Sequence, residues 1–233
     1  ILIPQAIMAI VKPLVSAADS LPAILLAVLI GHLLWFAGIH GAAIVSGMLQ
    51  MFWLTNLGMN QQALAQCAPL PHICMEAFWT FFIVIGGSGA TMGLVFCYLR
   101  SRSAHLRSIG RLSVVPSLFN INEPVIFGTP IVMNPVFFIP FLLAPMVNAV
   151  LAWAAMKLDL IGRVISVVPW TAPAPIGGAW ALGWEFRAAI LVVVRACVSA
   201  IIYFPFFKVY EKQLLAQEAE EAQRMAEESQ QTA

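Results

Sequence analysis

Charged residues are scarce in this sequence. Asp, Glu, Lys and Arg together make up 10% of the 233 residues, whereas hydrophobic residues make up 61%. A soluble domain of this length has too little interior for so much apolar surface, so the composition excludes an ordinary soluble protein. With a mean hydropathy of +0.89, the chain is predicted to be an integral membrane protein.

Cysteine is also rare, with four residues in the chain. Their spacing matches no zinc motif, so we expect neither a metal site nor a cofactor. Cys67 and Cys74 flank a short loop and could pair if it faced the outside, although we expect free thiols. The formal net charge is +1, and no nucleic-acid partner is expected.

The start of the chain lacks a basic segment followed by a short apolar core and a cleavage site, so no cleavable signal peptide is predicted. Residues 1–19 are expected to end a membrane helix that belongs to a larger protein. Asp19 and Ser20 are then expected to cap the next helix, and Pro22 suits its first turn.

Several apolar stretches have a length suited to the membrane, since a hydrocarbon core of about 30 Å needs a helix of about 20 residues. The predicted spans are residues 21–39, 76–99, 136–156 and 188–207. Residues 42–58 are apolar but shorter, which predicts a half-helix. Residues 60–74 are predicted to form a polar loop, and His72 in this loop and Glu76 just after it are expected to be interfacial.

Basic residues gather between two of these spans, at Arg100, Arg102, Arg107 and Arg111. Because Lys and Arg accumulate in cytoplasmic loops, residues 100–112 are placed in the cytoplasm and Asp159 and Arg163 outside. Six of the eleven acidic residues follow residue 210. The chain is therefore divided into a membrane domain, residues 1–209, and a charged, solvated cytoplasmic tail, residues 210–233.

Residues 117–135 form an apolar segment that a regular helix cannot accommodate. Its prolines, and Pro116 before it, remove backbone donors and disturb the preceding residues, which predicts a re-entrant hairpin that enters from the cytoplasmic side. Glu123 lies at the turn. A charge at membrane depth costs at least about 2.5 kcal/mol and marks a functional site by default. The alternative, that Glu123 only caps a helix in a cytoplasmic loop, fits poorly with its apolar neighbours.

A second broken segment covers residues 164–186 and contains three prolines and the pair Gly177–Gly178. It predicts a hairpin that enters from the opposite side, and two such segments between whole helices are typical of a transporter site near mid-membrane. Trp170 lies in this hairpin and could stack on a sugar ring. The predicted fold is thus an all-α integral membrane protein, a polytopic helical bundle with two re-entrant, Pro/Gly-broken hairpins.

Three further features have a structural and a functional interpretation. His40 lies between glycines that let the backbone unwind, so it is either a site residue or a satisfied structural histidine, whereas His32 is taken as structural. The small-residue run 86–93 favours close packing over ligand binding. Arg195 is expected to be buried, with Glu185 or a backbone carbonyl as its partner.

Three motifs resemble a known family: LLWFAGIHG at 33–41, FNINEPVIFGTPIVMNP at 119–135 and VPWTAPAPIGG at 168–178. They are similar to membrane component C (enzyme IIC, EIIC) of the bacterial phosphoenolpyruvate-dependent sugar phosphotransferase system (PTS), in its lactose/cellobiose/N,N'-diacetylchitobiose branch. Family members are longer, and the chain resembles their C-terminal substrate-binding domain. The resemblance implies two re-entrant hairpins, a homodimer formed through the N-terminal domain, and the bacterial cytoplasmic (inner) membrane.

The resemblance also implies site residues and partners. Glu123 and His40 would lie near the sugar 6-hydroxyl as catalytic groups, Asn122 would bind sugar hydroxyls, and Trp35 and Trp170 would contact the pyranose rings. The permease would carry a β-linked disaccharide inward and present its hydroxyl to a phosphocysteine on EIIB, which EIIA serves indirectly.

Partial desolvation would make Glu123 a better proton acceptor, with His40 orienting the hydroxyl, although sequence leaves open which of the two takes the proton. The alternative from a different class is an ion-coupled sugar symporter without phosphorylation, in which Glu123 carries the coupling proton. A channel or a structural subunit would leave Glu123 unexplained.

Overall fold

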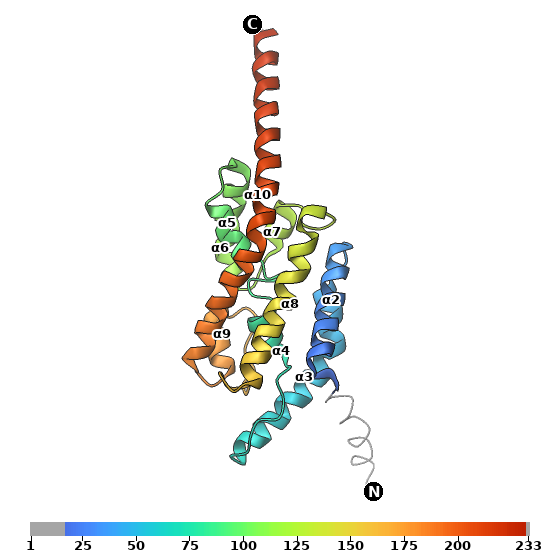
Figure 1. The fold of residues 1–233 in the computed structure, drawn as a ribbon, viewed down its shortest axis with the longest axis vertical. Helices are drawn as coiled ribbons and strands as arrows, with labels where there is room; N and C mark the ends of the chain where they lie inside the picture. Colours follow the sequence, from blue (N-terminus) through green and yellow to red (C-terminus); the bar gives the residue numbers. More distant parts are fainter. Residues whose placement is uncertain (1–16, 232–233) are drawn as a thin grey trace.

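The computed structural model describes residues 17–231, and every regular element among them is helical. Four long helices run along the molecule in Figure 1: α2 (Leu21–Phe36), α3 (Gly41–Ala65), α8 (Pro135–Lys157) and α10 (Phe186–Gln231). Helix α8 packs against both α2 and α10. Helices α3, α8 and α10 are long and apolar enough to cross a membrane, and α2 is apolar but shorter. The predicted helix end over residues 1–19 lies largely outside the described residues.

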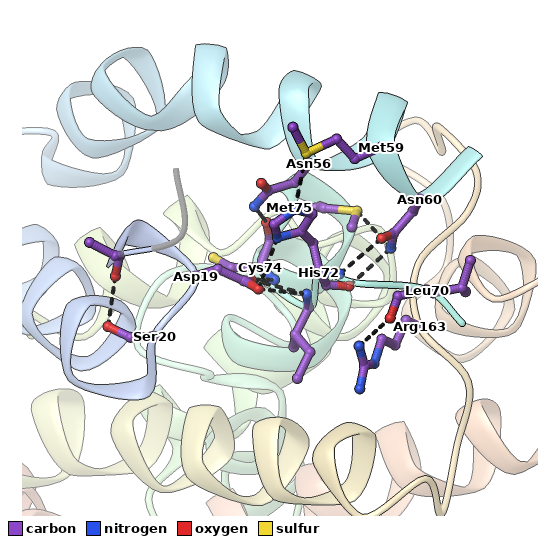
Figure 2. Close-up of polar contacts among 12 residues, drawn as sticks. Asp19, Ser20, Asn56, Met59, Asn60, Leu70, His72, Cys74, Met75 and Arg163 are labelled. Carbon is purple, nitrogen blue, oxygen red and sulfur yellow. Dashed lines mark hydrogen bonds and ion pairs between the residues drawn. The ribbon is translucent and has the colours of Figure 1, made fainter. Parts of the chain in front are cut away.

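Helix α3 is longer than predicted. The expected half-helix at 42–58 and the loop from residue 60 are wrong, because one helix continues to Ala65. The polar residues after position 58 suggested a loop. Polar side chains in this half of α3 instead form hydrogen bonds with the backbone of the segment that follows the helix. Asn56 Nδ2 donates to Cys74 O at 2.8 Å, and Asn60 exchanges hydrogen bonds with the backbone of His72 at 2.9 and 3.0 Å (Figure 2).

Asp19 does not cap α2 as predicted. Its carboxylate accepts hydrogen bonds from the backbone N–H groups of Ile73 and Cys74 and lies 3.2 Å from His72 Nδ1, as Figure 2 shows. Ser20 occupies the N-cap position without a side-chain capping bond. The contacts fasten the start of α2 to the loop after α3, because buried or half-buried backbone donors need an acceptor and the Asp19 carboxylate supplies it.

Residues 76–99 do not form the predicted continuous span. They divide into α4 (Glu76–Phe78), the π-helix η1 (Trp79–Ile83), an irregular stretch at 84–91, and α5 (Met92–Leu99). Gly86, Gly87 and Gly89 have φ values of +74°, +101° and +82°, which glycine adopts without strain. The small residues do allow close packing, since a Cβ on Gly93 would lie 2.4 Å from the backbone nitrogen of Ala200 in α10. They also break the helix.

The two hairpins predicted from proline and glycine are present. Helices α6 (Ala104–Leu118) and α7 (Glu123–Gly128) form the first, and the extended segment 162–173 with α9 (Ala174–Ala181) forms the second. The first hairpin begins earlier than the predicted residue 117, because most of the basic segment 100–112, predicted to be a loop, belongs to α6. In Figure 1 the first enters from the end of the bundle where α10 projects, and the second lies at the opposite end. The predicted fold class, an all-α helical bundle with two re-entrant hairpins, is confirmed.

Helix α10 continues through the predicted boundary between residues 209 and 210. The tail was expected to be solvated, but this is wrong for its first turns. Glu211 is buried and accepts hydrogen bonds from Ser101 Oγ and the Arg102 N–H, both at 2.7 Å. Glu218 accepts from Ser103 Oγ at 2.6 Å. The carboxylates of the tail therefore hold the backbone and hydroxyls that begin α6.

Arg195 is fully buried in α10, as expected of an arginine at membrane depth. Its guanidinium donates to Asn148 O at 3.3 Å and to Phe81 O at 3.4 Å. Of the two predicted partners, a backbone carbonyl is correct and Glu185 is wrong, because Glu185 pairs with Arg187 at 2.7 Å.

Candidate functional site

Three broken segments meet at the side chain of Asn120, in the turn of the first hairpin. Its Oδ1 accepts the Gly86 N–H at 3.2 Å, and its Nδ2 donates to Trp170 O at 2.8 Å and to Ala172 O at 3.1 Å. The residue has a φ of +62°, a left-handed conformation that asparagine tolerates better than most residues. One amide therefore joins the tips of both hairpins to the irregular stretch 84–91.

Asn122 anchors the same turn from its other side. Its Nδ2 donates to Ser88 O at 2.6 Å and to Thr91 Oγ1 at 2.9 Å. A Cβ on Gly87 would lie 2.3 Å from the Asn122 side chain, so only glycine fits there. These contacts fix the N-cap of α7 and therefore the position of Glu123, the first residue of that helix.

His32 holds the irregular stretch to α2. Its ring nitrogens lie 2.7 Å from Val28 O and 2.9 Å from the Gly89 N–H, so Nδ1 carries the proton and Nε2 accepts. The structural interpretation of His32 is confirmed.

A pocket of about 410 Å³ lies against these broken segments and α3. This volume falls within the range of ligand sites in proteins. Trp35, His40, Asn122, Glu123 and Trp170, the five predicted site residues, all line it. The structure thus brings together residues that are up to 135 positions apart (170 − 35) in the sequence.

His40 is fixed at the start of α3. Its Nδ1 accepts the backbone N–H of Ala43 at 3.1 Å, so a neutral ring carries its proton on Nε2. The ring packs on Trp35, with 4.3 Å between centroids. Neutral His40 therefore offers the pocket a hydrogen-bond donor.

Glu123 is exposed in the open pocket, and its carboxylate has no partner within residues 17–231. The expected partial desolvation is therefore absent. The Trp170 side chain is also open, at 52% exposure. Both groups are available to a ligand.

Comparison with known proteins identifies the family. A family profile described as "Phosphotransferase system, EIIC" matches residues 1–145, more than half of the chain. The chain belongs to this EIIC family. The resemblance based on the three motifs is confirmed, and the EIIC chain is part of a multi-pass protein of the cytoplasmic (inner) membrane.

Several curated relatives are sugar permease components. The cellobiose-specific EIIC component of Geobacillus stearothermophilus is 43% identical over 89% of this chain and 47% of its own length. The lichenan permease IIC component of Bacillus subtilis (strain 168) is 39% identical over 88% of this chain and 46% of its own length. The lactose-specific EIICB component of Streptococcus mutans serotype c is 37% identical over 94% of this chain and 39% of its own length.

A solved structure shows the same fold. The crystal structure of ChbC, the IIC component of the N,N'-diacetylchitobiose-specific phosphotransferase system, superposes with a TM-score of 0.86 at 40% identity. The match covers 89% of this chain and 49% of that one. The EIIC chain thus spans about half the length of the solved structure and of the curated relatives that it matches.

The EIIC pocket also contains residues that the sequence analysis did not assign to the site. Glu76 lines it and accepts a hydrogen bond from Gln50 Nε2 at 3.3 Å, although it was predicted to be interfacial. Trp53 and Trp79 line the same part of the pocket, with their rings 5.8 Å apart. Glu123 was selected because it is an acidic residue next to apolar residues. The same criterion applies to Glu76, but the polar segment before it suggested an interfacial position instead.

Proposed function

We propose that the protein is a PTS permease component that binds a β-linked disaccharide and presents its 6-hydroxyl to phosphorylated EIIB. The observation that carries the proposal is the pocket in which a carboxylate, an imidazole and an open indole ring converge from three separate segments. Sugar sites combine aromatic faces with a few polar groups in this way. The relatives named for cellobiose, lactose and N,N'-diacetylchitobiose support the substrate class.

The first sugar ring is assigned to the end of the pocket that holds Glu123 and His40. Trp170 offers an exposed ring for stacking on the apolar face of the pyranose. Trp35 lines the pocket beside His40 and is proposed to contact a pyranose ring as well. Asn122 uses both amide hydrogens within the protein, so its Oδ1, which has no partner within residues 17–231, is the atom left for a sugar hydroxyl.

The second ring is assigned to the end that holds Glu76. Ala43 and Ser46 line the pocket along α3 between His40 and Gln50, a distance of about 15 Å at 1.5 Å per residue. This length extends beyond one pyranose ring. At this end the Glu76 carboxylate and the Trp79 ring offer a second ring the same kinds of contact that the Glu123 carboxylate and the Trp170 ring offer the first. Glu76 therefore becomes the candidate for distinguishing one disaccharide from another.

Glu123 is proposed as the proton acceptor. In neutral His40 the lone pair of Nδ1 is used by Ala43 and Nε2 carries a proton, so the ring can donate to the hydroxyl oxygen but has no free site for the incoming proton. The Glu123 carboxylate is unpaired and open to the pocket. Phosphoryl transfer needs an aligned hydroxyl and a group that takes its proton, which this pair supplies.

The phosphoryl donor is proposed to be a phosphocysteine on EIIB, which EIIA phosphorylates. The lactose-specific relative carries both the C and the B designation in its name. The segment that joins α5 to α6 and carries the exposed Arg100 and Arg102 lies at the end of the bundle where α10 projects (Figure 1). The exposed Arg107 and Arg111 follow in α6, and we assign this end to the cytoplasm. The other half of the protein is proposed to form a homodimer. Residues 1–209 are assigned as the sugar-binding membrane domain and residues 210–233 as its cytoplasmic extension.

The test is the chemical form of the transported sugar. Cells that hold the full permease and phosphorylated EIIB take up radiolabelled cellobiose, lactose or N,N'-diacetylchitobiose, and the label inside is identified by chromatography. Sugar phosphate is expected. Free sugar accumulated against a gradient without EIIB would establish the ion-coupled symporter and reject the phosphotransferase mechanism.

A further inference from the structure

We propose that Asn120 is a positioning residue that holds the Trp170 ring against the sugar by tying the tips of the two re-entrant hairpins together. This inference rests on the proposed function, in which Trp170 contacts the pyranose. Asn120 itself is almost fully buried, and its side chain is saturated by backbone groups of other segments, so it acts through them.

The tip of the second hairpin has few other attachments. Within residues 169–173 the Ala172 N–H donates to Pro169 O at 2.9 Å, and Pro173 O accepts the Gly177 N–H at 2.8 Å at the start of α9. Within residues 17–231, no side chain other than Asn120 forms a hydrogen bond to the backbone of residues 169–173. The indole of Trp170 is half exposed, so packing alone constrains it weakly. The hydrogen bonds from the Asn120 amide to the backbone on either side of the turn therefore fix the position of the Trp170 ring.

The chemistry of the contact requires an amide. Nδ2 faces two carbonyl oxygens, whereas Oδ1 faces an N–H, so an amide satisfies all three groups and a carboxylate satisfies one. The residue lies three positions before Glu123 on the same hairpin. It therefore sets the distance between the proposed proton acceptor and the proposed aromatic platform, which come from opposite ends of the bundle (Figure 1).

Asn120→Asp tests the donor function directly. The substitution preserves the size of the side chain, its tolerance of positive φ and the acceptor for Gly86, but it replaces two donors by an oxygen that faces two carbonyls. Asn134→Asp is the matched control, since Asn134 is an N-cap that accepts from Val136 N at 3.0 Å and aspartate caps equally well. Asn120→Ser removes both amide donors without adding charge, although its shorter side chain also removes the Oδ1 acceptor of Gly86.

The measurement is a double-mutant cycle on the purified full-length protein, with equilibrium binding of cellobiose, lactose and N,N'-diacetylchitobiose. Asn120→Asp is expected to weaken binding about tenfold or more in the wild-type background. In the Trp170→Ala background it should weaken binding by less than about threefold, because the ring that it positions is absent. Asn134→Asp should leave binding unchanged in both backgrounds.

Three results would overturn the inference: equal losses from Asn120→Asp with and without the Trp170 ring, no loss at all, or failure of both Asn120 variants to fold, which would assign the amide to stability. A different result would count against the proposed function. If Trp170→Ala alone leaves disaccharide binding unchanged, the sugar contact of this ring is wrong, whatever Asn120 does.

Discussion

Glu123→Gln separates sugar binding from phosphoryl transfer. The amide keeps the shape of the side chain and its hydrogen-bonding reach but cannot accept a proton at neutral pH. We expect the variant to bind disaccharide nearly as well as the wild type and to phosphorylate it far more slowly. A general base is identified when the phosphorylation rate falls by a much larger factor than the binding affinity.

The structure sets the magnitude of each effect. Glu123 forms no ion pair or hydrogen bond within residues 17–231, so its charge can be removed without leaving a buried partner unsatisfied. Binding should then lose at most one ordinary hydrogen bond, about 0.5–1.5 kcal/mol, which is about a twofold to tenfold change. General-base assistance contributes about 10²- to 10⁴-fold, or about 3–5 kcal/mol at 1.36 kcal/mol per tenfold.

The assay pairs two measurements on the full-length protein. Equilibrium binding of the best of the three disaccharides gives the affinity, and the rate of sugar phosphate formation with phosphorylated EIIB gives the chemistry. Glu185→Gln serves as the matched control, because Glu185 pairs with Arg187 and does not line the pocket. His40→Asn, which retains a capping side chain, should lower binding and phosphorylation by similar factors because its donor already acts in the ground state.

One result would refute the reasoning. A Glu123→Gln protein that binds normally and phosphorylates at the wild-type rate would show that no proton passes to this carboxylate. A comparable fall in both measurements would instead make Glu123 a binding residue and return the role of base to another group.

Three further predictions concern the same pocket and its orientation. Trp170→Ala should weaken disaccharide binding by about 1–3 kcal/mol, a scale borrowed from nucleic-acid bases that stack on aromatic side chains. Trp184→Ala, outside the pocket, should have a smaller effect, and equal losses would remove the special role of Trp170. Glu76→Gln should change the ratio of affinities among cellobiose, lactose and N,N'-diacetylchitobiose, and a uniform loss for all three would contradict its assignment to the second ring. An impermeant maleimide added to intact cells should label native Cys67, which is exposed just after the end of α3, at the end of the molecule opposite the projecting part of α10. A cysteine introduced by Ser108→Cys should react only after the cells are permeabilised. The reverse pattern would invert the topology.

Local sequence determined the two hairpins. Proline removes a backbone donor and fixes φ, and glycine removes the side chain, so a segment rich in both cannot continue as a membrane helix wherever it stands in the fold. The same local reasoning found Glu123 at the first turn and Trp170 at the second, since a carboxylate or a broken motif in apolar surroundings is visible without knowledge of distant contacts.

Tertiary structure decided which polar residues are satisfied within the protein. Asn60 was predicted to lie in a loop, but it belongs to α3 and its side chain hydrogen-bonds to the chain that returns at His72. Glu211 was predicted to be solvated, but the segment 101–103 buries its carboxylate and donates hydrogen bonds to it. The third break, at 84–91, depends on Asn120, Asn122 and the ring of His32, which accept or supply the hydrogen bonds that the helix would have made. Local propensity cannot reveal such bonds, because the free energy of an unwound segment is set by partners tens of residues away.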